Sequence, residues 1–314
     1  MEIIQKYIEP FNIYCYENNK YTFFHINIAN KDIFYSNLFD YFFDENKLIQ
    51  YIENQKGIRF NPSKKQYVTL YKHLKNYIDI ENIEITIDMP DCQDFIQALS
   101  EEVTVQNENK NLKVRLDKFG KIGEYFFSVI LSIFFKFDCI IPKVHYTTDN
   151  NMNVYGIDTL FYSNQDNLLL FGESKFCIKL QNGINLVNES LKRYEQQIDE
   201  DFRLVLSGGF KNQCNQTFNE KFGTIRDESL TMKDFIENAN IENIGIPIFI
   251  THGTEIDEKD ILKKLNNIKK YSFFNVDTTY YYISLPIINK EELIKVFIEK
   301  TNSKLEYYLS ETRK

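Results

Sequence analysis

Hydrophobic and polar residues alternate in parts of the first hundred residues of this 314-residue chain, which predicts short strands there. Residues 21–28 and 83–88 show the two-residue alternation of half-buried strands. Pro62 falls at the first turn of a segment with helical character that extends to about Ile78. The N-terminal region, residues 1–105, is therefore expected to combine strands and helices.

The middle of the chain is predicted to fold as a helix, several strands and a second helix. Apolar residues dominate from about 119 to 135, which indicates a buried helix. Strands are expected at residues 138–144, 154–162 and 168–176, and a helix at 186–198, on which Val187, Leu191, Tyr194 and Ile198 recur at core spacing. This order fits an α/β fold in which a mixed β-sheet is covered by helices on both faces.

Breaks in the pattern divide the chain into three regions. The polar stretch at 101–113 is expected to be a linker or an exposed connection, and Ser207-Gly208-Gly209 marks a second break. After this break, strands are predicted at residues 246–252 and 280–286, and helices at 258–270 and 290–300. We therefore expect an N-terminal α+β region at 1–105, a core at 106–210 and a C-terminal α/β region at 211–314 that packs on the core.

Two acids and a lysine occur on two neighbouring predicted strands. If these strands form a hairpin about the turn-rich residues 163–167, Asp158 lies opposite Glu173. Facing residues have Cβ atoms about 5 Å apart, a distance at which like charges are unfavourable. A divalent cation such as Mg²⁺ between the carboxylates relieves this repulsion. Strand alternation places Lys175 on the same face as Glu173, and such a group meets the needs of metal-assisted phosphodiester hydrolysis.

Glu124 is an acid within the apolar helix predicted at 119–135. A buried charge costs several kcal/mol unless it is paired or coordinated, so Glu124 is a further candidate for the site. Three of the four residues also have a structural alternative. Glu124 would be an acid favoured by the helix dipole, Asp158 a strand-end residue facing water, and Lys175 the partner of a simple salt bridge. Their occurrence together favours a functional site.

These residues resemble the active site of the PD-(D/E)xK nuclease superfamily, in which a helical Glu, a strand Asp and a Glu-x-Lys on the next strand act together. The corresponding residues of this chain are Glu124, Asp158, Glu173 and Lys175. The flanking residues look like those of the nuclease subunit of the Hachiman anti-phage defence system: Gly123-Glu124, Gly156-Ile157-Asp158 and Phe171-Gly172-Glu173-Ser174-Lys175. Ile157 departs from the superfamily pattern, which has Pro before the Asp.

The resemblance implies a restriction-endonuclease-like core with α+β flanks on both sides. It implies a Mg²⁺-dependent deoxyribonuclease, with Mn²⁺ as a substitute, in which Asp158, Glu173 and Glu124 hold the metal. It also implies a heterodimer with a superfamily 2 type helicase, which would dock on the flanks and above all on residues 1–105. Residues on the helix after the site would contact DNA phosphates: Lys192, Arg193 and Gln196.

The charge of the chain argues against independent binding of nucleic acid. The formal net charge is −8, whereas a protein that binds DNA unaided presents a basic face, because phosphate neutralisation supplies most non-specific affinity. Contact with DNA is therefore expected to be local, metal-assisted or delivered by a partner. No Gly-rich loop ends in Gly-Lys-Ser or Gly-Lys-Thr, so no ATP site is expected on this chain.

Cysteine spacing and hydropathy favour a cytoplasmic protein without membrane spans. The five cysteines are widely spaced and include no Cys-x-x-Cys pair, which is typical of reduced thiols. The N-terminus has no signal-peptide pattern. The most apolar segment, 125–135, is far shorter than the roughly 18 residues that span a bilayer.

Two alternatives to a deoxyribonuclease remain open. A nuclease-like fold can be a catalytically inactive structural subunit of a nucleic-acid-processing complex, which suits the acidic balance and the long flanks. The same site can also cleave RNA, because the motifs do not distinguish RNA from DNA. The four acidic and basic residues, kept together at an energetic cost, favour an active enzyme over an inactive fold.

Overall fold

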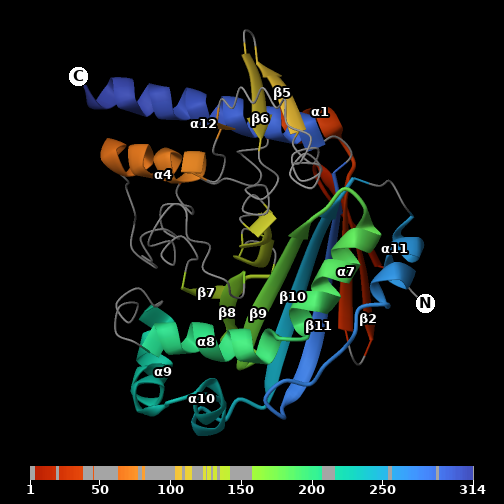
Figure 1. Cartoon of the computed structure of the whole chain (residues 1–314), viewed down its shortest axis with the longest axis vertical. Helices are drawn as coiled ribbons and strands as arrows, with labels where there is room; N and C mark the ends of the chain where they lie inside the picture. The colour runs from red at the N-terminus through yellow and green to blue at the C-terminus, as the bar shows by residue number, and fades with distance from the viewer. Residues whose placement is uncertain are drawn as a thin grey trace, which may run out of the picture.

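An eight-stranded sheet forms the centre of the structure (Figure 1). The computed structural model describes residues 4–18, 21–37, 45, 63–76, 80–81, 103–107, 110–114, 123–124, 126–128, 130–132, 135–141, 158–206, 216–253, 257–287 and 290–313. The strands of the large sheet, in spatial order, are β1 (Ile4–Ile8), β2 (Phe11–Asn18), β3 (Tyr21–Ile28), β11 (Asp277–Pro286), β10 (Asn243–His252), β9 (Leu168–Phe176), β8 (Thr159–Ser163) and β7 (Asp138–Ile141). A smaller sheet contains β4 (Ile80–Glu81), β6 (Lys110–Val114) and β5 (Val103–Asn107).

The large sheet is parallel at its centre and antiparallel at both margins. Strands β3, β11, β10 and β9 pair in parallel, whereas β1, β2 and β3 on one side and β9, β8 and β7 on the other pair antiparallel. This mixed sheet with its helices confirms the predicted α/β fold. The sheet takes strands from all three regions predicted from the sequence, and the region boundaries themselves stay a prediction.

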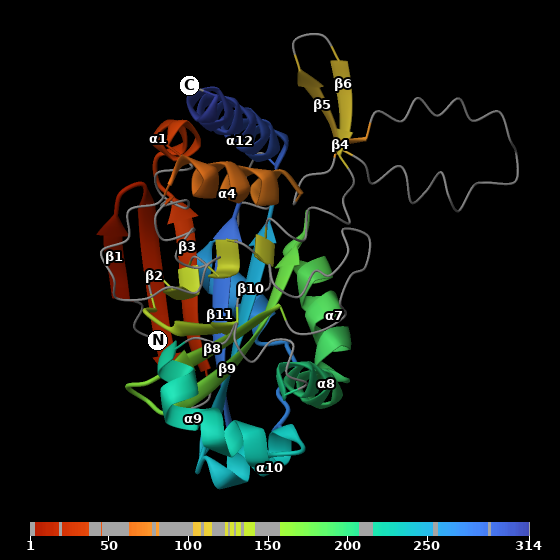
Figure 2. The same ribbon diagram turned by 90° about the vertical axis from the view of Figure 1, so that its left-hand side faces the viewer.

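Helices cover both faces of the sheet. One apolar layer joins the sheet to α7 (Leu180–Leu191), α8 (Tyr194–Leu206), α9 (Gln216–Glu228), α10 (Met232–Asn238) and α11 (Glu258–Leu265). The layer on the other face includes the helical residues 126–127 and 130–131 with α1 (Lys31–Ser36), α4 (Lys64–Asn76) and α12 (Lys290–Thr312). Helix α12 packs along α4 beside the small sheet (Figures 1 and 2).

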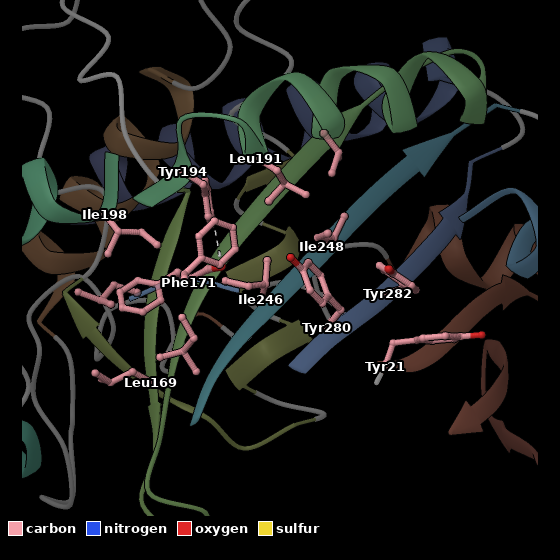
Figure 3. Close-up of a cluster of buried hydrophobic side chains, with 14 of the residues drawn as sticks. Tyr21, Leu169, Phe171, Leu191, Tyr194, Ile198, Ile246, Ile248, Tyr280 and Tyr282 are labelled. Carbon is pink, nitrogen blue, oxygen red and sulfur yellow. Dashed lines mark hydrogen bonds between the residues drawn. The ribbon is translucent and has the colours of Figure 1, made fainter. Parts of the chain in front are cut away.

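Strand β9 lies between the two apolar layers. Leu169 and Phe171 belong to the layer under α7 (Figure 3), and Leu168 and Leu170 belong to the opposite layer. A strand covered on both faces is apolar at consecutive positions rather than at alternate ones. The continuous apolar run at the start of β9 therefore follows from its central place in the sheet.

The helix predicted at 186–198 is two helices, α7 and α8, and the prediction of a single helix is wrong. The N–H groups of Lys192 and Arg193 donate to the carbonyls three residues earlier, those of Glu189 and Ser190, at 3.3 and 3.1 Å. This tight turn ends α7 and starts α8. The predicted core positions on both sides of the turn are nevertheless buried: Val187, Leu191, Tyr194 and Ile198.

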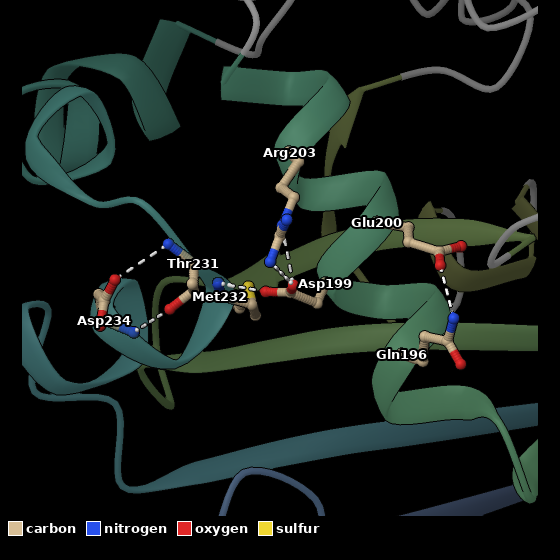
Figure 4. A network of polar contacts seen from close by, with 7 residues as sticks. All are labelled: Gln196, Asp199, Glu200, Arg203, Thr231, Met232 and Asp234. Carbon is tan, nitrogen blue, oxygen red and sulfur yellow. Dashed lines mark hydrogen bonds and ion pairs between the residues drawn. The ribbon is translucent and has the colours of Figure 1, made fainter.

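Helix α8 is linked to α10 by a side-chain cap (Figure 4). The carboxylate of Asp199 accepts from the backbone N–H of Met232 at 2.8 Å and also pairs with Arg203. Thr231 and Asp234 form a capping box at the same helix start, which satisfies further N–H groups of the first turn. These contacts fix α8 with respect to α10, and thereby help to hold the helices that cover β9.

The polar stretch at 101–113, predicted to be a linker or an exposed connection, contributes the antiparallel strands β5 and β6, so a linker there is wrong. Other predictions agree with the structure, including β3, β10, β11, α4, α11 and α12. The strand predicted at 83–88 and parts of those at 138–144 and 154–162 lie outside the described residues. No helix within the described ranges is long and apolar enough to cross a membrane, and no disulfide joins the cysteines described there.

Candidate active site

The β8–β9 hairpin brings Asp158 across from Glu173. The pairing of the two strands extends to Thr159, the first residue of β8, which pairs with Gly172 of β9. The next residue, Asp158, donates its backbone N–H to the carbonyl oxygen of Gly172 at 3.0 Å. Its carboxylate Oδ2 accepts from the backbone N–H of Ser174 at 2.6 Å. These two bonds hold Asp158 beside residues 172–174 of β9, so the two acids are neighbours, and both are buried.

Lys175 forms an ion pair with Glu173. The side chain of Lys175 is 22% exposed and that of Glu173 is 4% exposed, so the lysine lies at the border of the site and the acid inside it. Both side chains point to the face of the sheet that α7 covers, since they occupy the same alternate positions of β9 as Leu169 and Phe171.

The site contains more negative than positive charge. Burial raises the pKa of Glu173, and the neighbouring Asp158 raises it further, while Lys175 offsets part of the shift. Burial lowers the pKa of Lys175, but the attraction of Glu173 and Asp158 outweighs this effect and leaves the pKa above its ordinary value. The two shifts are linked, because Asp158 raises the pKa of Glu173 and both acids raise the pKa of Lys175. An additional cation would stabilise this group of charges.

Glu124 approaches the site from the helix on the opposite face of the sheet. The preceding residue, Gly123, lies against Phe176, and a Cβ atom at Gly123 would come within 3.3 Å of the Phe176 Cβ. The described helical residues 123–124 therefore lie at the carboxyl end of β9. There the carboxylate of Glu124 interacts electrostatically with Lys175, in addition to the stronger interactions that Glu173 and Asp158 make. The structure thus brings all four predicted residues into one neighbourhood.

The three residues predicted to contact phosphates lie at the turn between α7 and α8 and at the start of α8. Lys192 pairs with Glu189 at 2.6 Å, and both side chains are exposed. Gln196 donates to Glu200 at 2.7 Å on the surface of α8 (Figure 4). Arg193 is also exposed. These residues are available to solvent, and their described contacts are with neighbouring acids rather than with the buried group.

A comparison with protein families gives a match over nearly the whole chain. The family model described as HamA matches residues 4–301. The chain belongs to the HamA family. The match includes all eight strands of the large sheet and the four candidate residues, so this HamA-like chain is a protein of the Hachiman defence system. No curated protein matches the chain.

Two polar residues near the acids of this HamA-family chain were missed as site residues in the sequence. Ser190 on α7 lies close enough to Glu173 to help lower its pKa. Tyr194 at the start of α8 is buried and donates its hydroxyl to the carbonyl oxygen of Phe171 at 3.0 Å (Figure 3). The helical periodicity identifies Tyr194 as a core residue, but it carries no information about its hydroxyl group. Only the fold brings Ser190 near Glu173.

The donor atoms of the site suit a hard divalent cation. Carboxylate oxygens are preferred ligands of Mg²⁺, which commonly binds through one or two carboxylates and completes its coordination with water and phosphate. Asp158 and Glu173 provide two carboxylates at the buried end of the hairpin. Within the described residues, no group of three or more His, Cys, Asp or Glu side chains is arranged to hold a metal ion. The residues therefore fit a Mg²⁺ site that relies on two protein carboxylates, and they do not resemble a closed structural metal site.

Proposed function

We propose that this HamA-family chain is a metal-dependent deoxyribonuclease of the PD-(D/E)xK type that acts in Hachiman defence. The proposal is supported by the buried group that the β8–β9 hairpin assembles from Asp158, Glu173 and Lys175. Two facing carboxylates raise the free energy of the folded chain unless a cation compensates them. Their retention beside a lysine and near Glu124 favours a role in hydrolysis of a phosphodiester.

The carboxylates of Asp158 and Glu173 are the groups that would hold Mg²⁺ or Mn²⁺, and Glu124 lies near them without completing a three-carboxylate cluster. When bound, such a cation supplies Lewis-acid chemistry at a phosphoryl oxygen and makes water more acidic. The backbone N–H of Ser174 holds one oxygen of Asp158 at 2.6 Å, so this carboxylate has a fixed orientation. A fixed ligand lowers the reorganisation that binding requires.

Lys175 has the role of a positive hydrogen-bond donor rather than a base. Burial lowers its pKa, but the raising effect of Glu173 and Asp158 is larger, so Lys175 keeps its proton near neutral pH. A protonated amine at the border of the site can stabilise negative charge that develops on the phosphate. It also orients water through its N–H groups.

The DNA is proposed to reach the site through a superfamily 2 type helicase. With a net charge of −8, the chain attracts DNA weakly, since the dominant electrostatic contribution has the wrong sign over much of the surface. A helicase partner would restrict access of host DNA and supply strands during translocation. A comparison of cleavage by the isolated chain and by its complex, with and without ATP, tests this point. Full-rate cleavage by the isolated chain, unchanged when the helicase is added, would contradict it.

Single substitutions test the nuclease proposal directly. Asp158→Asn, Glu173→Gln and Lys175→Met are expected to reduce Mg²⁺-dependent cleavage of labelled DNA at least about 100-fold, because each removes a charge from the site. The matched controls are Glu237→Gln and Lys233→Met, which change an exposed ion pair on α10 and should keep normal activity. If Glu173→Gln cleaves DNA as fast as the unaltered chain, the proposal is wrong.

One observation favours the alternative of a catalytically inactive structural subunit. Within the described ranges, no three candidate ligand residues are grouped around one point, and Lys175 already pairs with Glu173. An inactive subunit would cleave neither DNA nor RNA with Mg²⁺ or Mn²⁺, alone or with the helicase. Cleavage of RNA but not DNA by the same assay would instead identify a ribonuclease with the same site.

A further inference from the structure

A group of exposed cations lies where the end of α7 meets the segment that follows α11. Helix α11 packs beside α7 (Figure 1). The segments 188–195 and 266–274 contain four cations and two acids, whereas the whole chain has a net charge of −8. All four cations are exposed, and together they are called the basic cluster: Lys192, Arg193, Lys269 and Lys270.

Two side-chain contacts hold the two segments of the basic cluster together. At one end, Asn188 donates its side-chain amide to the carbonyl oxygen of Asn267 at 3.3 Å and accepts from the backbone N–H of Lys269 at 2.8 Å. At the other end, the carboxylate of Glu195 accepts from the backbone N–H of Phe274 at 3.0 Å. The cations are therefore held close to one another by contacts that leave their own charged groups available.

The segment after α11 is also fixed against the sheet. The ammonium group of Lys270 lies 5.0 Å from the ring centre of Tyr21 and 5.8 Å from that of Tyr282 (Figure 3). The backbone N–H and the carbonyl oxygen of Tyr271 both bond to the hydroxyl of Tyr280, at 2.7 and 2.9 Å. The ring of Tyr271 is half-buried. Cations beside an accessible aromatic ring are typical of surfaces that bind single-stranded nucleic acid.

The basic cluster already surrounds one anion of its own. Glu189 pairs with Lys192 at 2.6 Å, and both side chains are exposed. The hydrogen bond and the charge of Lys192 lower the pKa of Glu189, and Lys269 and Arg193 lower it further. Cations from both segments thus act on a single surface carboxylate. Since they exceed it in charge, the cluster can attract a further anion.

Tyr194 connects the basic cluster to the candidate active site. This residue follows Arg193, and its ring packs against that of Phe273 with the centroids 5.8 Å apart. Its hydroxyl donates to the carbonyl oxygen of Phe171 on β9 at 3.0 Å (Figure 3). Phe171 precedes Glu173 by two residues, so a single side chain extends from the basic cluster to the strand that carries the acid.

We propose that the basic cluster binds the phosphate backbone of single-stranded DNA next to the site of cleavage. The choice of DNA as the ligand rests on the proposed nuclease function. Lysine and arginine side chains bind backbone phosphates without regard to base sequence, and such contacts position the strand. The segment after α11 thereby takes part in substrate binding, and Glu189 competes with the DNA phosphates for the same cations.

The test measures binding of a short labelled single-stranded oligonucleotide to the full chain by fluorescence anisotropy, in EDTA and over a range of salt concentrations. The double variant Arg193→Gln/Lys269→Gln should reduce the salt slope by about 1.4 and weaken binding roughly 10- to 30-fold at about 0.1 M salt, since each phosphate contact to a single strand contributes about 0.7 to the slope. The charge-matched control is Lys64→Gln/Lys233→Gln, which removes two exposed lysines on α4 and α10 and should change binding little.

A variant of opposite sign gives a second measurement. Glu189→Gln removes the competing carboxylate and should tighten binding about 5-fold at about 0.1 M salt. The control Glu237→Gln removes an exposed acid that lies near a lysine on α10 and should leave the affinity unchanged. Equal effects of the cluster variants and their controls would show that only the net charge matters, and would overturn the inference. Tighter binding of duplex than of single-stranded DNA would overturn the assignment of a single strand.

The outcomes separate this inference from the proposed function, because binding is measured without a divalent cation. If the unaltered chain cleaves DNA with Mg²⁺ while Arg193→Gln/Lys269→Gln binds DNA as tightly as the unaltered chain, the basic cluster is not a binding surface and the nuclease stands. If DNA binding depends on the cluster but neither Mg²⁺ nor Mn²⁺ gives cleavage, alone or with the helicase, the proposed function fails and the binding surface remains.

Discussion

The buried histidine of β3 gives a quantitative prediction about stability. His25 is 2% exposed, and its Nδ1 atom lies 3.3 Å from the hydroxyl oxygen of Ser284 on β11. The same hydroxyl oxygen lies 2.9 Å from Nε2 of His252 on β10. Burial lowers the pKa of His25 from 6.5 to about 4, although the negative charge of Asp257 raises it slightly. The folded chain therefore holds His25 neutral at a pH where the unfolded chain protonates it.

The sign and size of the effect follow from proton linkage. Below pH 6.5 the unfolded chain gains a proton at His25 that the folded chain does not accept until about pH 4. The free energy of unfolding therefore falls as the pH decreases through this window, and the loss levels off below it. The two pKa values give a loss of about 2 kcal/mol at pH 5 and about 3 kcal/mol at pH 4 relative to neutral pH.

Urea unfolding of the unaltered chain and of His25→Asn, followed by circular dichroism at pH 7.5 and pH 5, measures this loss. Asparagine keeps a polar group towards Ser284 but does not titrate, and its packing defect is the same at both pH values. The stability advantage of the unaltered chain over His25→Asn should therefore shrink by about 2 kcal/mol at pH 5. If the difference between the two proteins is the same at both pH values, His25 is not held neutral by burial and the reasoning is refuted.

Two further substitutions test how α7 and α8 pack on the sheet. Gly183→Ala gains about 1 kcal/mol of helix propensity but forces a Cβ atom within 2.7 Å of Ile250 Cγ2, and overpacking costs typically 1–3 kcal/mol, roughly. We expect thermal unfolding to show that Gly183→Ala destabilises the chain. The control Gly223→Ala, with no atom within 4 Å of the new Cβ, should be neutral or stabilising. Equal effects of the two substitutions would contradict the close contact at Gly183. Tyr194→Phe removes the bond to the Phe171 carbonyl and should lower the free energy of unfolding by about 1 kcal/mol; an unchanged value would show that this bond contributes nothing.

Local patterns in the sequence were sufficient to predict that Asp158 and Glu173 lie close together. The strands of the β8–β9 hairpin are adjacent in the chain, so the position of the turn determines which residues face each other. The pairing of Thr159 with Gly172 agrees with a hairpin folded about residues 163–167. Glu124 was harder to place, because its contact with the site depends on a helix packing against the end of β9 through Gly123 and Phe176.

Two local predictions were wrong for identifiable physical reasons. In residues 101–113, charged and amide residues hide a weak alternation of apolar and polar positions. Val103 and Val105 belong to this alternation, and they lie on the strand β5, which pairs with β6. At the end of α7, core residues continue at helical spacing through Leu191 and Tyr194. A turn that preserves the apolar stripe is invisible to periodicity, and the break at Lys192 appears only in the backbone hydrogen bonds.

The order of the strands could not be predicted, and it determines the surroundings of the site. On the face covered by α7, the strand register aligns Lys175 on β9 with Ile250, Ser284 and His25 on β10, β11 and β3. Glu173 lies two residues nearer the amino end of β9. At that level of the sheet, the residues aligned with it on β10, β11 and β3 are apolar or aromatic. Polar groups on this face thus gather at the carboxyl ends of the parallel strands, where α/β proteins commonly bind ligands. Since β3, β10 and β11 come from the regions flanking the predicted core, those regions build this end of the sheet.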